Sequence, residues 1–359
     1  MRMRWRHLAV LAVAVPALVF GLAWSGLIGV RASTGHWAAT DWFLHWVMRN
    51  SVRTASLSTE PSRHDDPSST AAAAAHFQSG CAVCHGSPAE QRSSTMLSML
   101  PPPPDLSVAV NAWTDAQLFE IVKHGVRFTG MPSWPTQVRD DEVWAMVGFL
   151  RNLPQMSARD YIELSGLQLT PTARSLTPLV MTCESCHAQG RPGNGGAVPL
   201  ISGQSEAYLL ESLKAYKAGR RPSGIMSVAL GPLSQDDLKK LAGHYAEQRV
   251  SWQQVGPTNA ERYQAGLQLA QNGRSIDRIP ACLSCHERDN GNEDYPRLFG
   301  QNAAYLGQQL RLFRMGVRGG GKASHLMAVA AKNLTDEDID TLASFFSQRN
   351  NDRPSAAMD

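Results

Sequence analysis

Apolar residues recur along most of this chain at the spacing of helices rather than strands. Three segments place them on one helical face, at positions 143–150, 209–216 and 306–313. An alanine-rich stretch from Ala71 to Cys84 predicts a further helix. No convincing run of alternating apolar and polar residues is present, so the pattern predicts an all-α fold.

Capping signals mark where several of these helices begin. Thr114 with Gln117 forms a capping box before an apolar run. The segments 234–237 and 335–338, each a Ser or Thr followed three residues later by Asp, predict the starts of two later helices.

The N-terminus predicts a transmembrane helix. Basic residues at positions 2, 4 and 6 precede an uncharged apolar run from Leu8 to Val30, which as a helix would be about 34 Å long, enough to cross a bilayer. We expect residues 1–32 to be a retained anchor with a cytoplasmic N-terminus. A cleaved signal peptide, cut near Val30-Arg31-Ala32, is the alternative. In a bacterium the anchor would lie in the inner membrane, with the rest of the chain in the periplasm.

The segment after the expected span divides into a helix and a tether. Trp37, Trp42 and Trp46 crowd near the predicted membrane exit, and indole rings favour the headgroup boundary. Residues 51–70 are rich in Ser, Thr, Pro and charge and lack an apolar period. We therefore predict an interfacial helix and flexible tether over residues 33–70. Further linker signals around 152–172 and 248–259 divide the remainder into modules 71–155, 170–249 and 258–350.

The second and third modules are internal repeats. The segment 226–238 aligns without a gap on 327–339, and Gly203-Gln-Ser-Glu-Ala-Tyr-Leu matches Gly300-Gln-Asn-Ala-Ala-Tyr-Leu. Both modules are therefore expected to be copies of one design.

Each module contains one copy of the pattern Cys-x-x-Cys-His. The copies use all six cysteines and are followed at once by His85, His187 and His286; the cysteines are Cys81, Cys84, Cys183, Cys186, Cys282 and Cys285. Two thiols at this spacing can bond to the two vinyl groups of one porphyrin and bring the histidine to the iron. We therefore predict three covalently bound haem c groups. Zinc, disulfide or thiol-redox alternatives fit less well, because the pairs lie about 100 residues apart, a spacing typical of one small domain each.

A methionine is the expected sixth iron ligand in each module. Met226 is the single methionine between His187 and Cys282, and the repeat then selects Met327 over Met315 and Met358. In the first module Met131 lies in a Gly-Met-Pro loop, whereas Met96 and Met99 follow His85 too closely and Met146 lies on a helix face. Met315 is expected to pack within its helix.

Prolines after each motif are candidate acceptors for the second ring nitrogen of each histidine. An axial imidazole usually donates this N–H to a carbonyl, and the candidates are Pro103 or Pro104, Pro199 and Pro296. Ordinary turn prolines remain the alternative.

Charge adds one exclusion. The formal net charge is +3 and no basic tract is present, so nucleic acid is not an expected partner.

With motifs, methionines and helices located, residues 71–350 resemble class I cytochromes c. The first module, with Gly130-Met-Pro-Ser-Trp134, is similar to single-haem cytochromes associated with respiratory oxidases and dehydrogenases. Modules two and three, with Val198-Pro-Leu-Ile-Ser-Gly-Gln204 and Tyr295-Pro-Arg-Leu-Phe-Gly-Gln301, resemble dihaem cytochrome c4. That resemblance implies two domains related by a pseudo-twofold axis, with the basic segments 217–221 and 314–318 as candidates for haem propionate or interface contacts. The fold class expected is all-α, with an N-terminal transmembrane helix followed by three class I cytochrome c domains.

Three closed iron sites favour an electron carrier rather than an enzyme. We expect a membrane-anchored carrier in a periplasmic respiratory chain, directed toward a terminal oxidase. Its donor would be a quinol-oxidising complex or a dehydrogenase, and its acceptor an oxidase or a soluble cytochrome. The alternatives are a haem-wiring subunit of a membrane dehydrogenase or oxidase complex and a haem enzyme with one open iron.

Overall fold

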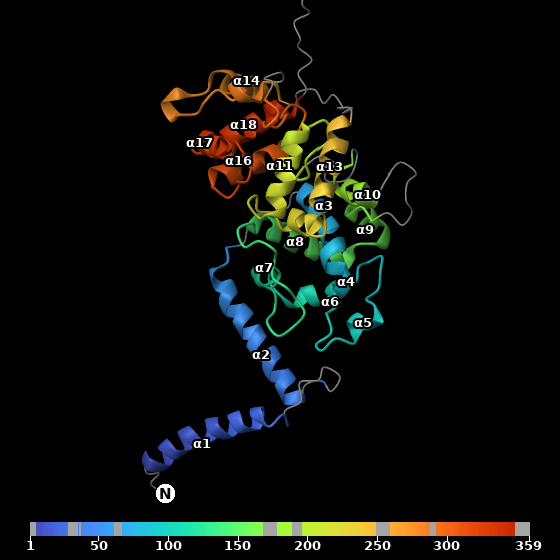
Figure 1. The fold of residues 1–359 in the computed structure, drawn as a ribbon, viewed down its shortest axis with the longest axis vertical. Helices are drawn as coiled ribbons and strands as arrows, with labels where there is room; N and C mark the ends of the chain where they lie inside the picture. Colours follow the sequence, from blue (N-terminus) through green and yellow to red (C-terminus); the bar gives the residue numbers. More distant parts are fainter. Residues whose placement is uncertain are drawn as a thin grey trace, which may run out of the picture.

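The computed structural model describes residues 5–27, 35, 37–60, 67–167, 178–188, 196–248, 259–287 and 292–348. Helices dominate this part of the chain (Figure 1). Its extended pairing is limited to one isolated bridge between Arg274 and Ile279. The all-α expectation is confirmed.

The first module is built around α3 and α8. Its elements are α3 (Pro67–His76), a π-helical turn (Phe77–Cys81), α4 (Ala82–His85), α5 (Ser94–Leu97), α6 (Leu106–Ala109), α7 (Asp115–His124), α8 (Asp140–Asn152) and α9 (Ala158–Ser165). The predicted capping box of Thr114 and Gln117 starts α7. Phe77 packs against Phe149, with ring centroids 5.2 Å apart, and against the fully buried Tyr161 of α9. The core of this module thus includes a residue beyond the predicted boundary at 155.

The second and third modules repeat one helical arrangement. The second contains α10 (Pro178–His187), α11 (Glu206–Lys217), α12 (Gly224–Leu230) and α13 (Gln235–Glu247). The third contains α14 (Ala260–Asn272), α15 (Leu283–His286), α16 (Ala303–Arg314), α17 (Ser324–Ala331) and α18 (Asp336–Ser347). Helix α11 packs on α13 as α16 packs on α18, and both predicted capping boxes are present. The repeat seen in the sequence is therefore a structural repeat as well.

Helix α14 crosses α18 closely at a glycine. A Cβ added at Gly266 would lie 2.6 Å from Phe345 Cβ and 2.7 Å from the Thr341 carbonyl oxygen. The absent side chain lets the two helices approach and gives Phe345 its place in the core of the third module.

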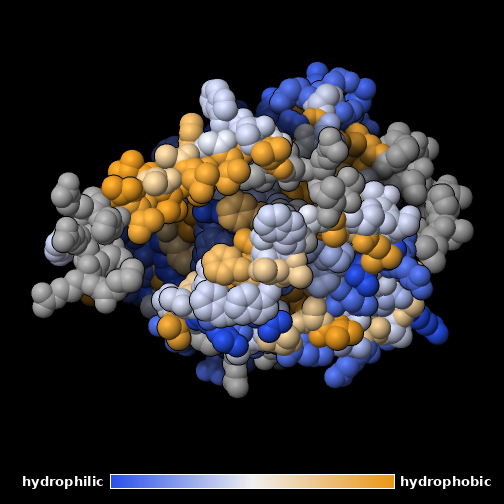
Figure 2. All heavy atoms as spheres, turned by 90° about the horizontal axis from the view of Figure 1, so that it is seen from below, coloured by the Kyte–Doolittle hydropathy of each residue, from blue (hydrophilic) through white to orange (hydrophobic). Residues whose placement is uncertain are grey.

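The predicted N-terminal transmembrane helix is wrong. Helix α1 (Trp5–Trp24) does not continue to Val30, because the chain turns at Ser25 and Gly26, where Gly26 has φ +72°. In the described part of the chain, no helix combines the length and the apolar character needed to cross a bilayer. The single-span, inner-membrane location inferred from it is corrected with it. Figure 2, seen from the α1 end of the molecule, shows hydrophobic residues gathered there.

The segment predicted as interfacial helix and tether is partly packed on the first module. Helix α2 (Ala38–Ala55) is followed by a 3-10 turn (Ser56–Ser58). Arg49 lies over the Trp113 ring, 5.9 Å from its centroid, and the Thr59 hydroxyl donates to Glu120 at 2.6 Å. Residues 51–60 are thus helix and packed turn, and residues 61–66 lie outside the described part.

Candidate functional site

The first Cys-x-x-Cys-His motif follows directly from the α3 segment. Cys81 ends the π-helical turn, and Cys84 and His85 lie in α4. The Nδ1 atom of His85 is 3.0 Å from the carbonyl oxygen of Pro104. Because a carbonyl only accepts, this nitrogen carries the proton, and the lone pair of Nε2 is left available to bind a metal. The predicted proline contact is confirmed.

Met131 lies in a loop between α7 and α8 whose backbone is held at several points. Gly125 has φ +65°, and a Cβ there would lie 2.5 Å from the Pro132 carbonyl carbon, so the turn requires glycine. The Met131 N–H donates to the Thr129 hydroxyl at 3.1 Å, and its carbonyl accepts from Val126 N–H at 3.2 Å. The loop therefore presents its methionine on a constrained backbone.

The second motif lies on one helix. Cys183, Cys186 and His187 are all part of α10, and His187 Nδ1 is 2.9 Å from the Pro199 carbonyl oxygen. Met226 lies in the first turn of α12, where its N–H donates to the hydroxyl of the N-cap residue Ser223 at 3.2 Å.

The third motif brings its two predicted iron ligands face to face. His286 Nε2 lies 3.5 Å from Met327 Sδ, while His286 Nδ1 is 3.4 Å from the Pro296 carbonyl oxygen. The imidazole thus donates on one side and faces a thioether on the other. The expectation that Met315 packs within its helix is wrong, because it lies at the end of α16 and is 60% exposed.

One cavity of about 840 Å³ joins the second and third sites. Both predicted ligand pairs line it, His187 with Met226 and His286 with Met327. Its walls include apolar residues of both modules, and its volume lies within the range of cofactor pockets. The residues that line the cavity, a histidine, a methionine and two cysteines from each of the two modules, are the donor types that hold haem c.

Burial keeps the first cysteine of each motif neutral. It raises the pKa of the Cys81 thiol to about 12 and the pKa values of Cys183 and Cys282 to about 11. All six cysteines are free thiols in the structure, so the disulfide alternative is not observed. The cysteines of the second and third motifs line the cavity described above, which places their thiols where a porphyrin could be attached.

Two buried glutamines join the second and third modules reciprocally. The Gln204 side chain donates to the Arg297 carbonyl at 2.8 Å and accepts from Arg297 N–H at 2.9 Å. Gln301 does the same with Leu200, at 2.8 and 2.9 Å. Each glutamine therefore holds the residue that follows the histidine-binding proline of the other module. Such a reciprocal exchange is the contact pattern that a pseudo-twofold axis between the two modules would give.

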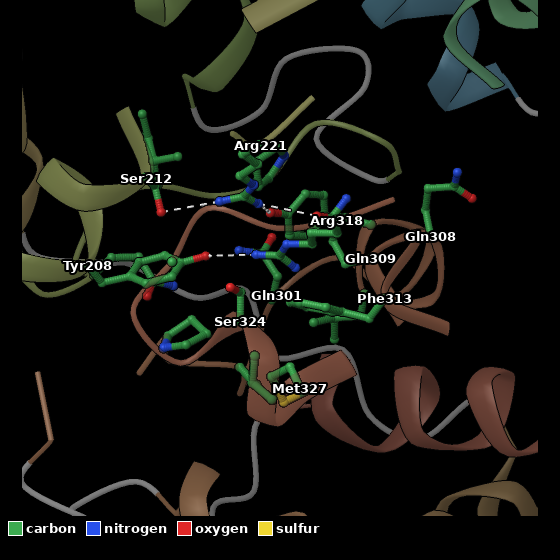
Figure 3. Close-up of a pocket in the computed structure, with 18 of the residues that line it drawn as sticks. Tyr208, Ser212, Arg221, Gln301, Gln308, Gln309, Phe313, Arg318, Ser324 and Met327 are labelled. Atoms are coloured by element: carbon green, nitrogen blue, oxygen red, sulfur yellow. Dashed lines mark hydrogen bonds between the residues drawn. The ribbon is translucent and has the colours of Figure 1, made fainter. Parts of the chain in front are cut away.

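Two arginines extend this symmetry across the cavity. Arg221 donates to Tyr305 at 3.0 Å, and Arg318 donates to Tyr208 at 3.3 Å, as Figure 3 shows for the second pair. Arg221 and Arg318, one from each of the basic segments expected to make propionate or interface contacts, thus make interface contacts. Burial tends to raise the pKa of Tyr208, but the positive charges of Arg221 and Arg318 have the larger effect and lower this pKa to about 8. Arg221 Nε is buried without a hydrogen-bond partner, which leaves a donor for an anionic group such as a haem propionate.

The first module contacts both others through the start of α8. Arg139 donates to the Pro222 carbonyl at 3.0 Å, and Asp141 accepts from Gln308 at 2.9 Å. Glu142 is buried and accepts from the Ser223 hydroxyl and the Gly224 N–H, both at 2.6 Å. Burial raises the pKa of Glu142, and Arg139 opposes that rise.

Sequence reasoning missed these α8 residues and the role of the glutamines. The Gly-Gln pair shared by both repeats was the available signal for Gln204 and Gln301. For residues 139–142 no comparable signal exists, since an acidic first helical turn is ordinary.

Comparisons with known proteins match both ends of the haem-motif region. Residues 68–150 match the family described as cytochrome C oxidase, cbb3-type, subunit III, and residues 263–349 match the family cytochrome c. Together with the motifs and helices, these matches define a c-type cytochrome, and domains of this class hold covalently bound haem c.

The more specific relationship comes from individual relatives. Cytochrome c4 of Azotobacter vinelandii is 34% identical over 177 residues, covering 45% of this chain and 82% of that protein. The chain belongs to the cytochrome c4 family. The thiosulfate dehydrogenase electron acceptor of Thiomonas intermedia is 31% identical, covering 46% of this chain and 77% of that protein. The solved structure of reduced cytochrome c4 from Pseudomonas stutzeri aligns at 31% identity with a TM-score of 0.41, covering 48% of this chain and 95% of that one.

These relatives confirm the expected class of function. The protein is an electron-carrying c-type cytochrome, acting as a carrier or as a subunit of an oxidoreductase.

Proposed function

We propose that this chain conducts electrons through three haem c groups, one in each module. His85 and Met131, His187 and Met226, and His286 and Met327 are the proposed axial pairs, and the six cysteines are the covalent attachment points. When bound, each haem supplies a one-electron Fe(III)/Fe(II) couple. The observation that carries the proposal is the repeated histidine environment, in which a proline carbonyl accepts from Nδ1 in all three motifs.

The residues around each site favour transfer over substrate chemistry. A histidine on one side and a methionine on the other leave no coordination position for oxygen or peroxide. The cavity shared by the second and third sites supports rapid transfer between them, because both ligand pairs line the same space. The three sites would act as a conductor with two closely coupled members.

For the external partners, we infer a dehydrogenase or quinol-oxidising complex as donor and a terminal oxidase as acceptor. The relative described as a thiosulfate dehydrogenase electron acceptor supports a dehydrogenase on the donor side. The likeness of residues 68–150 to an oxidase subunit supports an oxidase on the acceptor side. A soluble cytochrome is the other acceptor of compatible chemistry.

The same likeness favours one second candidate function. In it the chain is a permanent subunit that wires haems within an oxidase or dehydrogenase complex, rather than a diffusing carrier. Native electrophoresis of the holoprotein from its own cells separates the two: stable comigration with an oxidase or dehydrogenase activity supports the subunit, and migration as a free protein supports the carrier.

A haem count and a ligand spectrum test the main proposal. The pyridine haemochrome assay should give three haems per chain, and the oxidised protein should show the methionine-to-iron charge-transfer band. A high-spin ferric signal, or rapid carbon monoxide binding to the native reduced protein, would contradict three closed sites.

A further inference from the structure

The Met131 loop of the first site and the start of α12, which carries Met226, meet at one buried carboxylate. Trp134 lies three residues after Met131, and its indole N–H donates to Glu142 Oε2 at 3.2 Å. Gly224 lies two residues before Met226, and its N–H donates to the same oxygen at 2.6 Å. Glu142 therefore binds one residue near Met131 and one residue near Met226.

The contact between the Met131 loop and the start of α12 is close enough to require glycine at position 224. A Cβ added at Gly224 would lie 2.2 Å from Trp134 Nε1. The backbone at the start of α12 therefore packs directly on the Trp134 indole of the Met131 loop. Trp134 also packs against His76, with ring centroids 4.7 Å apart, just ahead of the segment that leads to the first haem motif. The Met131 loop and the start of α12 are thus packed directly against each other.

A hydrogen-bonded chain runs from Glu142 to the backbone of Met226. The Ser223 hydroxyl donates to Glu142 Oε1 at 2.6 Å and accepts from the Met226 N–H at 3.2 Å. Both Glu142 and Ser223 are buried, so water does not readily replace these bonds. The orientation of the Ser223 hydroxyl, and with it the first turn of α12, depends on a residue of another module.

The third module begins its corresponding helix differently. Ser324 holds the position aligned with Ser223, but α17 has Ala323 at its N-cap, without a side-chain cap, and Met327 N–H donates to the Ala323 carbonyl at 3.2 Å. The third methionine is therefore held by its own module, and Ser324 is a matched control.

We propose that Glu142 is a positioning residue for the second site, by which the first module sets the placement of Met226 through Ser223. This inference rests on the proposed function, since it takes Met226 as an iron ligand. It also places the first module next to the second in the electron path, with Trp134 at the contact between the Met131 loop and the start of α12. Through this contact the c4-like pair of modules is joined to a third, N-terminal module.

Two substitutions test this role in the holoprotein. E142Q keeps one acceptor oxygen and replaces the other with an NH₂, which must face either the N–H groups of Gly224 and Trp134 or the guanidinium of Arg139. S223A removes the hydroxyl that links Glu142 to Met226. In each variant we expect hydrogen exchange of residues 223–230 to rise about tenfold while residues 324–331 stay unchanged. We also expect the potential of the Met226 site to fall, by about 59 mV for each tenfold loss in the preference of methionine for ferrous over ferric iron. S324A should change neither quantity at the second site.

The outcomes separate this inference from the proposed function. Absence of a methionine-to-iron band in the unaltered protein contradicts the proposed function. An intact band, with both exchange and potential at the second site unchanged in E142Q and S223A, overturns the positioning role alone. Equal changes at the second and third sites also overturn it, since they indicate general loosening. If E142Q fails to fold, S223A decides, because it leaves the bonds from Arg139 and Gly224 in place.

Discussion

At the scale of single residues, each predicted ligand depends on one neighbouring contact. The imidazoles are oriented by proline carbonyls, and the methionines are held by loop or helix-start hydrogen bonds. The backbone acceptors of the imidazoles do not depend on side-chain identity, whereas the methionines of the first two sites depend on the hydroxyls of Thr129 and Ser223.

Substitution of Met226 by alanine should remove one site from the methionine-ligated set. The charge-transfer band should lose about one third of its intensity if the three sites contribute equally, and the potential of that haem should fall because the soft thioether is lost. Absorption and a redox titration measure both effects. M315A is the control, since Met315 is exposed at the end of α16, and it should leave the spectrum unchanged. A full band in M226A would refute this ligand assignment.

At the scale of elements, the start of α18 and its crossing with α14 are two tightly held points of the third module. Asp338 completes the capping box of α18 with Thr335 and receives two bonds from Arg274, at 3.0 and 2.8 Å. Although burial tends to raise the pKa of Asp338, these bonds lower it on balance.

The third module should therefore lose stability in acid through Asp338. A carboxyl with a lowered folded-state pKa contributes stability above its unfolded value of about 3.9, and this contribution is lost as pH falls through the lower folded-state pKa. D338N should reduce stability at neutral pH and flatten the loss below about pH 4. D237N removes the same box position from the exposed start of α13 and should have a smaller effect. Urea unfolding at several pH values measures both; equal slopes in D338N and the unaltered protein would argue against this role.

The crossing of α14 and α18 should not tolerate a methyl group. G266A forces Cβ against Phe345 and the Thr341 carbonyl, and overpacking of this kind typically costs about 1–3 kcal/mol. Calorimetry of the holoprotein should show a lower transition for the third module. At Gly321 an added Cβ meets nothing within 4 Å, so G321A should be nearly neutral. Similar transitions for both variants would disprove the tight crossing.

At the scale of the whole molecule, three modules contact one another through a few buried polar groups. Gln204 and Gln301 join the second and third modules, and Arg139 with Glu142 joins the first to the second. The polar segment 51–70 had suggested that the first module is joined to the rest only by a flexible tether. The module instead packs on the second module. Its packing places the first module against both of the others.

Removal of Gln301 should weaken the pairing of the second and third modules. Q301A leaves the N–H and carbonyl of Leu200 without their partner, at a cost of about 1–3 kcal/mol. We expect calorimetric unfolding of these modules to separate into two transitions, and electron exchange between their haems to slow. Q264A, at an exposed position on α14, is the control. A single unshifted transition in Q301A would contradict the reciprocal interface.

Much of the site was predictable because it is local in sequence. The spacing within Cys-x-x-Cys-His, the proline acceptors and the capping boxes each depend on residues close together in the chain, and the structure places them as expected. The membrane helix failed because apolar composition does not show where a helix ends, and here the chain turns at Gly26. The prediction for Met315 was wrong because a helical period does not show which residues of a helix are covered by the rest of the molecule.

By itself, the sequence determined the type of cofactor, the candidate ligands and the repeat of the second and third modules, since these follow from covalent spacing and helical periodicity. Only the tertiary structure decided how the modules meet. Gln204 and Gln301 reach backbone atoms far away in the chain, and across the module boundary Glu142 reaches one hydroxyl and one backbone N–H. Backbone partners are the same for almost every residue, so such contacts leave no pattern in the sequence that could reveal them.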